Sequence, residues 1–124
     1  MKTRRSQSTP LMMSFRGGVP DNAVHDIARA QAEALERLYG KPLYCHLVVK
    51  VPEAEGVDTC AVSLYLTLPG HIDLRVEPSD HPDQQFVDPG RAIVDVFQRA
   101  RGLIAERFAH RRRRKLQRLA APLT

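Results

Sequence analysis

Long apolar runs are missing from this 124-residue chain, which excludes a membrane-embedded protein. A membrane-spanning helix needs roughly 20 consecutive apolar residues, and no stretch approaches that length. The basic start of the sequence has the charge of a signal peptide, but its apolar stretch, LMM, is far shorter than the roughly 7–15 residues of a signal-peptide core. We therefore expect a cytoplasmic protein of one domain, with no membrane partner.

Motifs for catalysis, cofactors and metals are also scarce. The five histidines lack the spacing of metal ligands, and the two cysteines do not complete a zinc site. Gly17 and Gly18 are not followed by the rest of a phosphate-binding glycine loop. Asp80, His81 and Asp83 are close in sequence, but their setting is more typical of a polar loop than of a metal or acid–base cluster. The sequence predicts that the protein is not an enzyme and has no cofactor, no metal and no small-molecule substrate.

Acidic residues are missing from both ends of the chain. All fourteen lie between Asp21 and Glu106, whereas nine of the nineteen basic residues lie outside residues 16–110. Residues 16–110 therefore carry ten bases and fourteen acids, a net charge of −4, and the two ends add +9. Such asymmetry favours an anionic partner, most often a nucleic acid, although basic ends also occur as simple solvated segments.

Apolar periodicity predicts six elements of secondary structure. Strands with one buried face are expected where apolar and polar residues alternate, at residues 11–16, 43–51, 59–68 and 71–77. Helical spacing follows Pro20-Asp21, with Asp21 or Asn22 as the N-cap, and ends at Gly40. A second helical stripe follows Asp88 as N-cap and Pro89 as the first helical residue, and it runs as far as Phe108. The fold class is therefore α+β, in the order β-α-β-β-β-α, with two helices on one face of a four-stranded sheet. The pairing of the first strand stays open.

Three segments are expected along the chain. Residues 1–9 are polar and basic and are predicted to form a disordered N-terminal arm. Residues 10–110 form the α+β domain. Residues 111–124 form a basic C-terminal tail, which either continues the second helix into solvent or frays.

The register of the last two strands follows from pairing apolar residues with apolar residues. A three-residue turn at Pro69-Gly70-His71 places Leu68 opposite Ile72, whereas a two-residue turn would place it opposite a histidine. The same reasoning places Cys45 about 20 Å from Cys60 along the sheet, beyond the reach of a disulfide. Both cysteines are predicted to be buried thiols that face inward.

Four stretches of the chain, in order, resemble the hibernation-promoting factor and ribosome-associated inhibitor family of small bacterial ribosome-binding proteins. They are MSFRGGVPDNAV, ALERLYGKPLYCHLVV, LYLTLPGHIDLRVEPSDH and AIVDVFQRARGLIAERFAHRRRR, and together they cover about residues 11–115. The resemblance implies a fold like that of double-stranded RNA-binding domains. It also implies docking in the decoding channel of the small ribosomal subunit, where binding blocks translation and protects idle ribosomes in stationary phase or stress.

The chain departs from this family in three ways. Asp88-Pro89-Gly90 is inserted before the second helix, and the basic residues crowd beyond that helix instead of along it. No second domain follows, so we expect a short form without the tail domain that long members use to pair ribosomes. These departures concern the rRNA contacts more than the fold.

Nine basic residues are candidates for contact with rRNA, because Lys and Arg neutralise phosphates and release counterions. They are Arg16, Arg99, Arg101, Arg107, Arg111, Arg112, Arg113, Arg114 and Lys115. Arg16 and Arg99 match basic positions of the family. Arg101 and Arg99 flank the apolar stripe, where simple solvation is the alternative. Arg107 falls inside the stripe, so the second helix is expected to have passed the edge of the sheet by then.

A second polar group falls on the predicted open face of the sheet: Arg16, Tyr44, His46, Lys50, Tyr65 and Arg75. A tyrosine there can stack on an unpaired base, and ordinary cross-strand contact is the alternative. For the whole protein we expect a translation inhibitor that binds the small ribosomal subunit and occludes the channel for mRNA and tRNA. The alternative is a protein-interaction module whose basic tail binds an acidic protein surface.

Overall fold

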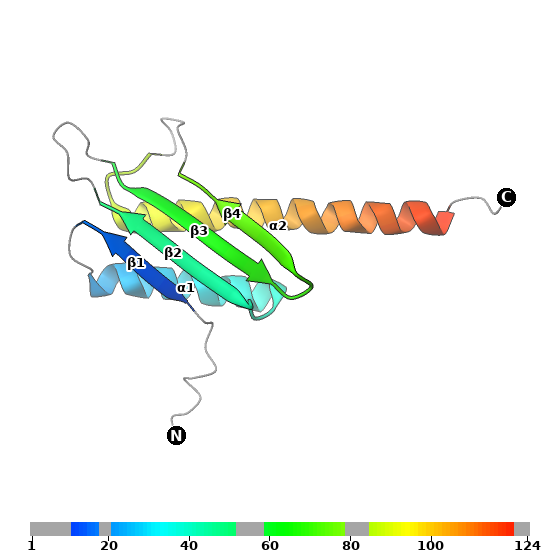
Figure 1. Ribbon diagram of the computed structural model, residues 1–124, viewed down its shortest axis with the longest axis horizontal. Helices are drawn as coiled ribbons and strands as arrows, with labels where there is room; N and C mark the ends of the chain where they lie inside the picture. Colours follow the sequence, from blue (N-terminus) through cyan, green and yellow to red (C-terminus); the bar gives the residue numbers. More distant parts are fainter. Residues whose placement is uncertain (1–10, 18–20, 52–58, 79–84, 121–124) are drawn as a thin grey trace, which may run out of the picture.

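Six elements follow one another in the order β1-α1-β2-β3-β4-α2 (Figure 1). The computed structural model describes residues 11–17, 21–51, 59–78 and 85–120. The strands are β1 (Met12–Arg16), β2 (Tyr44–Lys50), β3 (Ala61–Leu68) and β4 (Ile72–Val76), and the helices are α1 (Asn22–Tyr39) and α2 (Pro89–Ala120). This order confirms the predicted α+β class. The predicted arm at residues 1–9 and the loop that holds Asp80, His81 and Asp83 lie outside the described residues.

The strands form one sheet in the order β1-β2-β3-β4. β1 runs parallel to β2, a pairing that the sequence did not predict, and the other neighbouring strands are antiparallel. Leu68 pairs with Ile72, so the predicted register of the last hairpin is confirmed. Its turn contains two residues with positive φ, Gly70 at 89° and His71 at 58°, and this left-handed backbone closes the three-residue connection.

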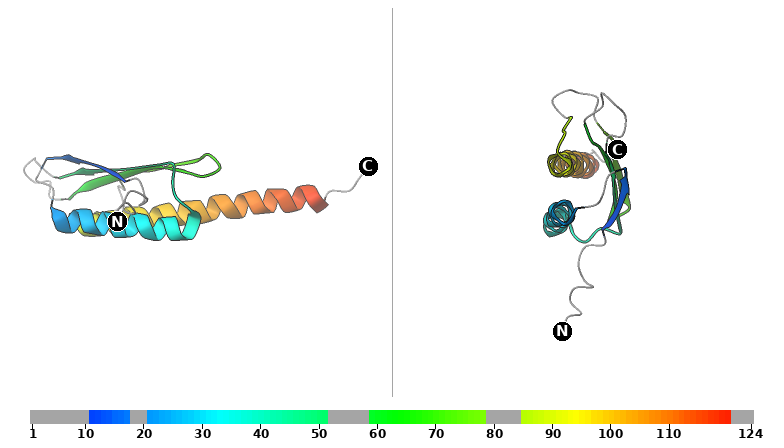
Figure 2. Two further views of the ribbon diagram at one scale, coloured as in Figure 1. Left: turned by 90° about the horizontal axis from the view of Figure 1, so that it is seen from below. Right: turned by 90° about the vertical axis from the view of Figure 1, so that its left-hand side faces the viewer.

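Both helices cover the same face of the sheet and lie side by side (Figure 2). Their small buried residues, such as Ala28 of α1 and Ala100 of α2, allow the helices to approach closely. At the start of α2 the two helices are in close contact, because a Cβ on Gly90 would lie 2.8 Å from Ile27 Cδ1. Apolar side chains from the inner face of the sheet complete a single core, with Phe97 as its largest fully buried side chain.

The helix ends follow the predicted capping residues. Asp21 is the N-cap of α1, and its carboxylate accepts a hydrogen bond of 2.9 Å from the Ala23 N–H. Gly40 ends α1 with a φ of 93° and donates its N–H to the Glu36 carbonyl oxygen. At the start of α2, the Asp88 carboxylate accepts a hydrogen bond from the Gly90 N–H, so the insertion seen in the sequence caps the helix.

Four side chains that were expected on the buried face are more exposed than predicted, and one of them, Leu38 in the last turn of α1, is 59% exposed. Leu43 is 61% exposed, because β2 begins one residue after it. Cys60 is half-buried, because it lies just before β3 and is paired only with Phe86, in an isolated bridge. Leu103 is 39% exposed, because it lies at the margin of the α2 stripe. The prediction for Cys45 is confirmed, since it is 2% exposed.

Candidate nucleic-acid interface

Helix α2 extends far beyond the sheet (Figures 1 and 2). Ile104 is its last fully buried residue, and Phe108 is half-buried against Tyr39, with ring centroids 5.6 Å apart. Every residue from His110 to Ala120 is exposed. At 1.5 Å per residue, the segment from Ile104 to Ala120 is about 24 Å long. We call residues 107–120 the projecting helix.

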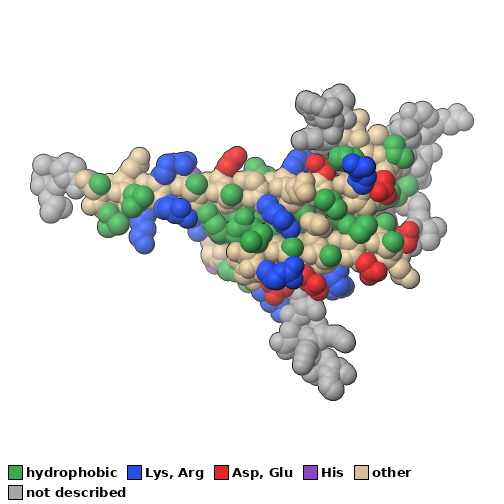
Figure 3. Space-filling view, turned by 180° about the vertical axis from the view of Figure 1, so that it is seen from behind, with side chains coloured by type: hydrophobic (Ala, Val, Ile, Leu, Met, Phe, Trp, Pro, Cys, Tyr) green, Lys and Arg blue, Asp and Glu red, His purple; other side chains and the backbone are tan. Residues whose placement is uncertain are grey.

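The projecting helix carries seven cationic side chains and no carboxylate. They are Arg107, Arg111, Arg112, Arg113, Arg114, Lys115 and Arg118. Among the described residues, Arg75 pairs with Glu77 and Arg99 with Asp95, and neither ion pair involves a cation of the projecting helix. Figure 3 shows Lys and Arg side chains along this helix, whereas Asp and Glu lie over the rest of the molecule.

Most of these cations continue the face of α2 that is buried in the core. Successive residues of a helix are about 100° apart, so Arg107, Arg111, Arg114, Lys115 and Arg118 share a sector about 100° wide. Ile93, Phe97, Ala100 and Ile104, all buried, fall in the same sector. The core-facing side of α2 therefore changes from apolar to cationic where the sheet ends.

The position of Arg111 agrees with this geometry. One terminal nitrogen of its guanidinium lies 3.6 Å from the place that a Cβ on Gly70 would occupy, in the turn between β3 and β4. This turn is the end of the sheet, so the residues of α2 after Arg111 have no strand to pack against. Arg112 and Arg113 point in other directions, which gives the projecting helix positive charge around most of its circumference.

Arg99 and Arg101 lie on the part of α2 that packs against the sheet. Arg99 donates a hydrogen bond of 2.9 Å from Nε to the Asp95 carboxylate and one of 3.0 Å from Nη1 to the Glu77 carbonyl oxygen. Its side chain, 26% exposed, thus connects α2 to the residue that follows β4. Arg101 is half-buried, and its Nε is buried without a hydrogen-bond partner in the described part of the chain.

The structure thus divides the nine predicted residues among three places. Six of them lie together on the projecting helix, two lie on the packed part of α2, and Arg16 lies on the open face of the sheet, at the end of β1. Arg118 also lies on the projecting helix but was not among the site residues predicted from the sequence. The signal that could have found it is its spacing, seven residues after Arg111 and four after Arg114, which places it on their face once the helix is known to continue.

A shallow groove of about 480 Å³ lies between α2 and β4, next to the projecting helix. Its lining includes apolar Leu74 and Leu103 together with Arg107, His110 and Arg113. Glu106 also contributes to the lining and opposes part of this positive charge. The groove brings three nitrogen-bearing side chains of α2 to the edge of the sheet.

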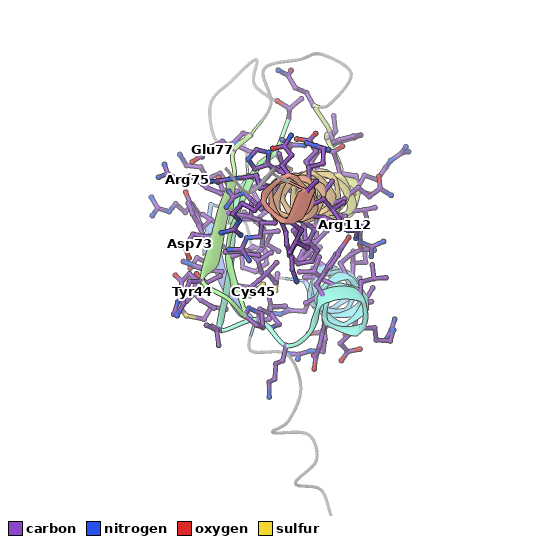
Figure 4. All side chains as sticks on the ribbon, turned by 90° about the vertical axis from the view of Figure 1, so that its right-hand side faces the viewer. Tyr44, Cys45, Asp73, Arg75, Glu77 and Arg112 are labelled. Carbon is purple, nitrogen blue, oxygen red and sulfur yellow. The ribbon has the colours of Figure 1, made fainter. Side chains whose placement is uncertain are left out.

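The open face of the sheet gathers the second predicted group. Met13 and Phe15 pack against the core, so Met12, Ser14 and Arg16 of β1 face away from the helices. Figure 4 shows Arg75 on the side of the sheet away from the helices and Arg112 on the helix side. The two basic regions therefore lie on different faces of the molecule.

The described residues contain no group of three or more His, Cys, Asp or Glu that could hold a metal ion. Burial raises the pKa of the Cys45 thiol from 9.0 to about 12. Burial and the negative charge of Asp88 raise the pKa of the Cys60 thiol as well, so neither thiol is an activated nucleophile at neutral pH.

Neither helix is long and apolar enough to cross a membrane, over the residues that the structure describes. Compared with known proteins, the chain matches no family model and no curated protein.

Proposed function

We propose that this protein is a ribosome-associated translation inhibitor, which binds rRNA of the small subunit and occludes the channel for mRNA and tRNA. The observation that carries the proposal is the projecting helix, where seven cations extend from the body without a described carboxylate partner. Each Lys or Arg that meets a phosphate releases condensed counterions, and this release supplies affinity without reading of the base sequence.

The acidic body does not prevent such binding. The projecting helix extends about 24 Å from Ile104, whereas the Debye length at physiological ionic strength is about 8 Å. Most carboxylates of the body are therefore screened from phosphates that contact the far half of the helix. Glu106 is the last acidic residue of the chain and lies at the base of the projecting helix.

The division of the molecule into a body and an extension fits inhibition by steric occlusion. The projecting helix would hold the phosphate backbone of rRNA, and the body would fill space that mRNA and tRNA otherwise use. The resemblance to the hibernation-promoting factor family supports this assignment, and the order of elements in the structure agrees with the fold that the resemblance implies.

A second candidate is a protein-interaction module that binds an acidic protein surface. Leu116 and Leu119 favour it, because they are 57% and 72% exposed on the projecting helix. Exposed leucines contribute little to phosphate binding, whereas they can pack against an apolar patch on another protein.

Sedimentation of stationary-phase lysate through a sucrose gradient tests the proposal. The protein is expected to migrate with small subunits or whole ribosomes at moderate salt. Residence in the free fractions at every salt concentration would contradict the proposal, and migration with another protein instead of ribosomes would favour the second candidate.

A pair of charge-matched variants tests the role of the projecting helix. Arg114→Gln with Arg118→Gln removes two of its cations, and Arg29→Gln with Arg37→Gln removes two exposed cations of α1. For purified ribosomes we expect the first pair to weaken binding and to reduce the slope of log K against log salt by about two, one for each lost phosphate contact. The second pair is expected to leave binding close to that of the unchanged protein.

A further inference from the structure

The open face of the sheet carries one row of side chains that crosses all four strands. Met12 lies opposite His46, His46 opposite Tyr65, and Tyr65 opposite Arg75. The neighbours of His46, Tyr65 and Arg75 in their strands are buried, and those of Met12 are half-buried against the core, so the four residues project from the face that the helices leave uncovered. The row therefore presents a thioether, an imidazole, a phenol and a guanidinium side by side. All four groups make favourable contacts with flat π systems.

His46 lies at the centre of an aromatic cluster on this face. Its ring centroid is 6.2 Å from that of Tyr65, with the planes tilted by 43°. Tyr44, two residues before His46 in the same strand, is at the same centroid distance, with the planes 80° apart. We call Tyr44, His46 and Tyr65 the aromatic platform.

Hydrogen bonds fix the imidazole of the aromatic platform in place. His46 Nε2 is 2.8 Å from the Ser14 hydroxyl, and His46 Nδ1 is 3.3 Å from the Tyr44 hydroxyl. A hydroxyl can donate or accept, so both contacts persist whichever ring nitrogen carries the proton. Because the ring is held from both sides, a flat ligand would bind to it with little loss of side-chain entropy.

Two positive charges lie at the ends of β1 and β2, on the same face of the sheet as the aromatic platform. Arg16 and Lys50 are directly opposite each other, both are exposed, and neither is ion-paired with a described carboxylate. Two like charges in this arrangement destabilise a sheet, and an anion between them would relieve the repulsion. Lys50 is four residues from His46 on the same strand, a separation of about 13 Å.

The described acids of this face are on β4 or directly after it, and each contacts a neighbour. Asp73 accepts a hydrogen bond of 2.8 Å from the Thr67 hydroxyl, and Glu77 lies 3.4 Å from Arg75 Nη1. In the sheet, β2 and β3 therefore lie between Arg16 and these acids, and β3 lies between Lys50 and these acids. A ligand that suits the aromatic platform and these two cations has flat faces joined by an anionic backbone.

We propose that the open face of the sheet binds a single-stranded segment of RNA, with unpaired bases stacked on Tyr44, His46 and Tyr65 and phosphates near Arg16 and Lys50. The faces of bases are hidden in a duplex, so only an unpaired segment can use the aromatic platform. This inference deepens the proposed function, on which it rests, because it assigns the chain a surface for bases in addition to the phosphate-binding projecting helix.

Tyrosine fluorescence provides a direct test, because the chain has three tyrosines and no tryptophan. Tyr39 contacts Phe108 on the helix side, so the Tyr39→Phe variant keeps only the two tyrosines of the aromatic platform. We expect a ten-nucleotide single strand to quench this emission strongly, and a duplex of equal length to leave it nearly unchanged. Equal quenching by both, or by neither, would overturn the inference.

Substitutions at Tyr65 separate stacking from other contributions. Tyr65→Thr keeps a good strand former but removes the ring, and it is expected to weaken binding of the labelled single strand roughly tenfold or more. Tyr65→Phe keeps the ring and is expected to bind within about twofold of the unchanged protein, as is the control Ser63→Ala on the same face. Full binding by a folded Tyr65→Thr variant, with folding checked by circular dichroism, would overturn the inference.

The outcome of this test is distinct from that of the gradient experiment. Migration with ribosomes without quenching by single strands would end the inference and leave the proposed function in place. Quenching by single strands without any association with ribosomes would end the proposed function and leave the aromatic platform as an RNA-binding surface. Binding of an acidic protein in preference to any oligonucleotide would count against both.

Discussion

Arg111 lies beside Gly70: a Cβ on this glycine would be 3.6 Å from Arg111 Nη1. The two residues are far apart in sequence, and together they mark the place where the sheet ends and α2 continues alone. Before this point the inner side of α2 is covered by strands and is apolar. After it nothing in the described structure covers this side, and cations replace the apolar residues.

Replacement of Gly70 by alanine is expected to lower the free energy of unfolding by about 1–2 kcal/mol, because its φ of 89° is a conformation that residues with a side chain rarely adopt. Denaturant unfolding monitored by circular dichroism measures the change. The matched control is Gly102→Ala in α2. Gly102 has open space around its Cα, so the control is expected to raise the free energy of unfolding by about 0.5–1 kcal/mol.

Replacement of Arg99 by glutamine is expected to lower the free energy of unfolding by about 1–2 kcal/mol, because its charge-assisted hydrogen bonds to Asp95 and Glu77 are lost. The partial exposure of Arg99 keeps the loss at the lower end of the range for charged groups. If Arg99 serves the fold alone, the salt slope of RNA binding does not change. A reduced slope with unchanged stability would instead assign Arg99 to the RNA interface.

The helicity of the projecting helix is expected to rise with salt concentration. Six pairs of like charges are spaced three or four residues apart in it: 107/111, 111/114, 111/115, 112/115, 114/118 and 115/118. Each such pair opposes helix formation by about 0.2–0.5 kcal/mol at low salt, and salt screens the repulsion. Far-UV circular dichroism measured from low to high salt reports the change.

A double variant provides the control for this effect. Arg111→Gln with Lys115→Gln removes every one of these pairs except 114/118, so its circular dichroism should change little with salt. If the double variant responds to salt as strongly as the unchanged protein, the salt-dependent change in circular dichroism arises outside the projecting helix and the prediction is wrong.

Cys45 is expected to make the protein less stable as the pH rises above 9. Burial raises the pKa of its thiol from 9.0 to about 12, so the unfolded chain releases a proton that the folded chain retains. The contribution of the Cys45 thiol to the free energy of unfolding is fully present below pH 9. It falls by about 1.4 kcal/mol per pH unit between pH 9 and 12. Denaturant unfolding at several pH values, compared with a Cys45→Val variant, isolates this slope, which the variant should lose.

Elements whose pattern is local could be predicted from the sequence. Alternation of apolar residues placed Leu68 opposite Ile72, and the capping residues Asp21 and Asp88 marked the starts of the two helices. The parallel pairing of β1 with β2 could not be predicted, because it depends on how α1 crosses the sheet and not on the residues of β1. The partial exposure of Cys60 has a similar cause, since its pairing partner, Phe86, is distant in sequence.

The candidate site shows the same division. The concentration of cations after Glu106 could be read from composition alone. The role of Arg99 in joining α2 to the end of β4 could not be predicted, because one of its acceptors is a backbone carbonyl 22 residues away. Arg118 was left out because the sequence did not decide whether the second helix continues or frays.

Helix α2 is one continuous element from Pro89 to Ala120, so its core-bound half and its cationic half have a fixed rotational phase. Insertion of a single residue after Ala109 would turn the later cations by about 100° around the helix axis relative to the sheet. Insertion of four residues would nearly restore the angle while moving these cations about 6 Å outward. The number of residues in α2 thus sets how the open face of the sheet is oriented relative to an RNA bound by these cations. A change in the length of this helix would reorient the body while every RNA-contacting side chain stays the same.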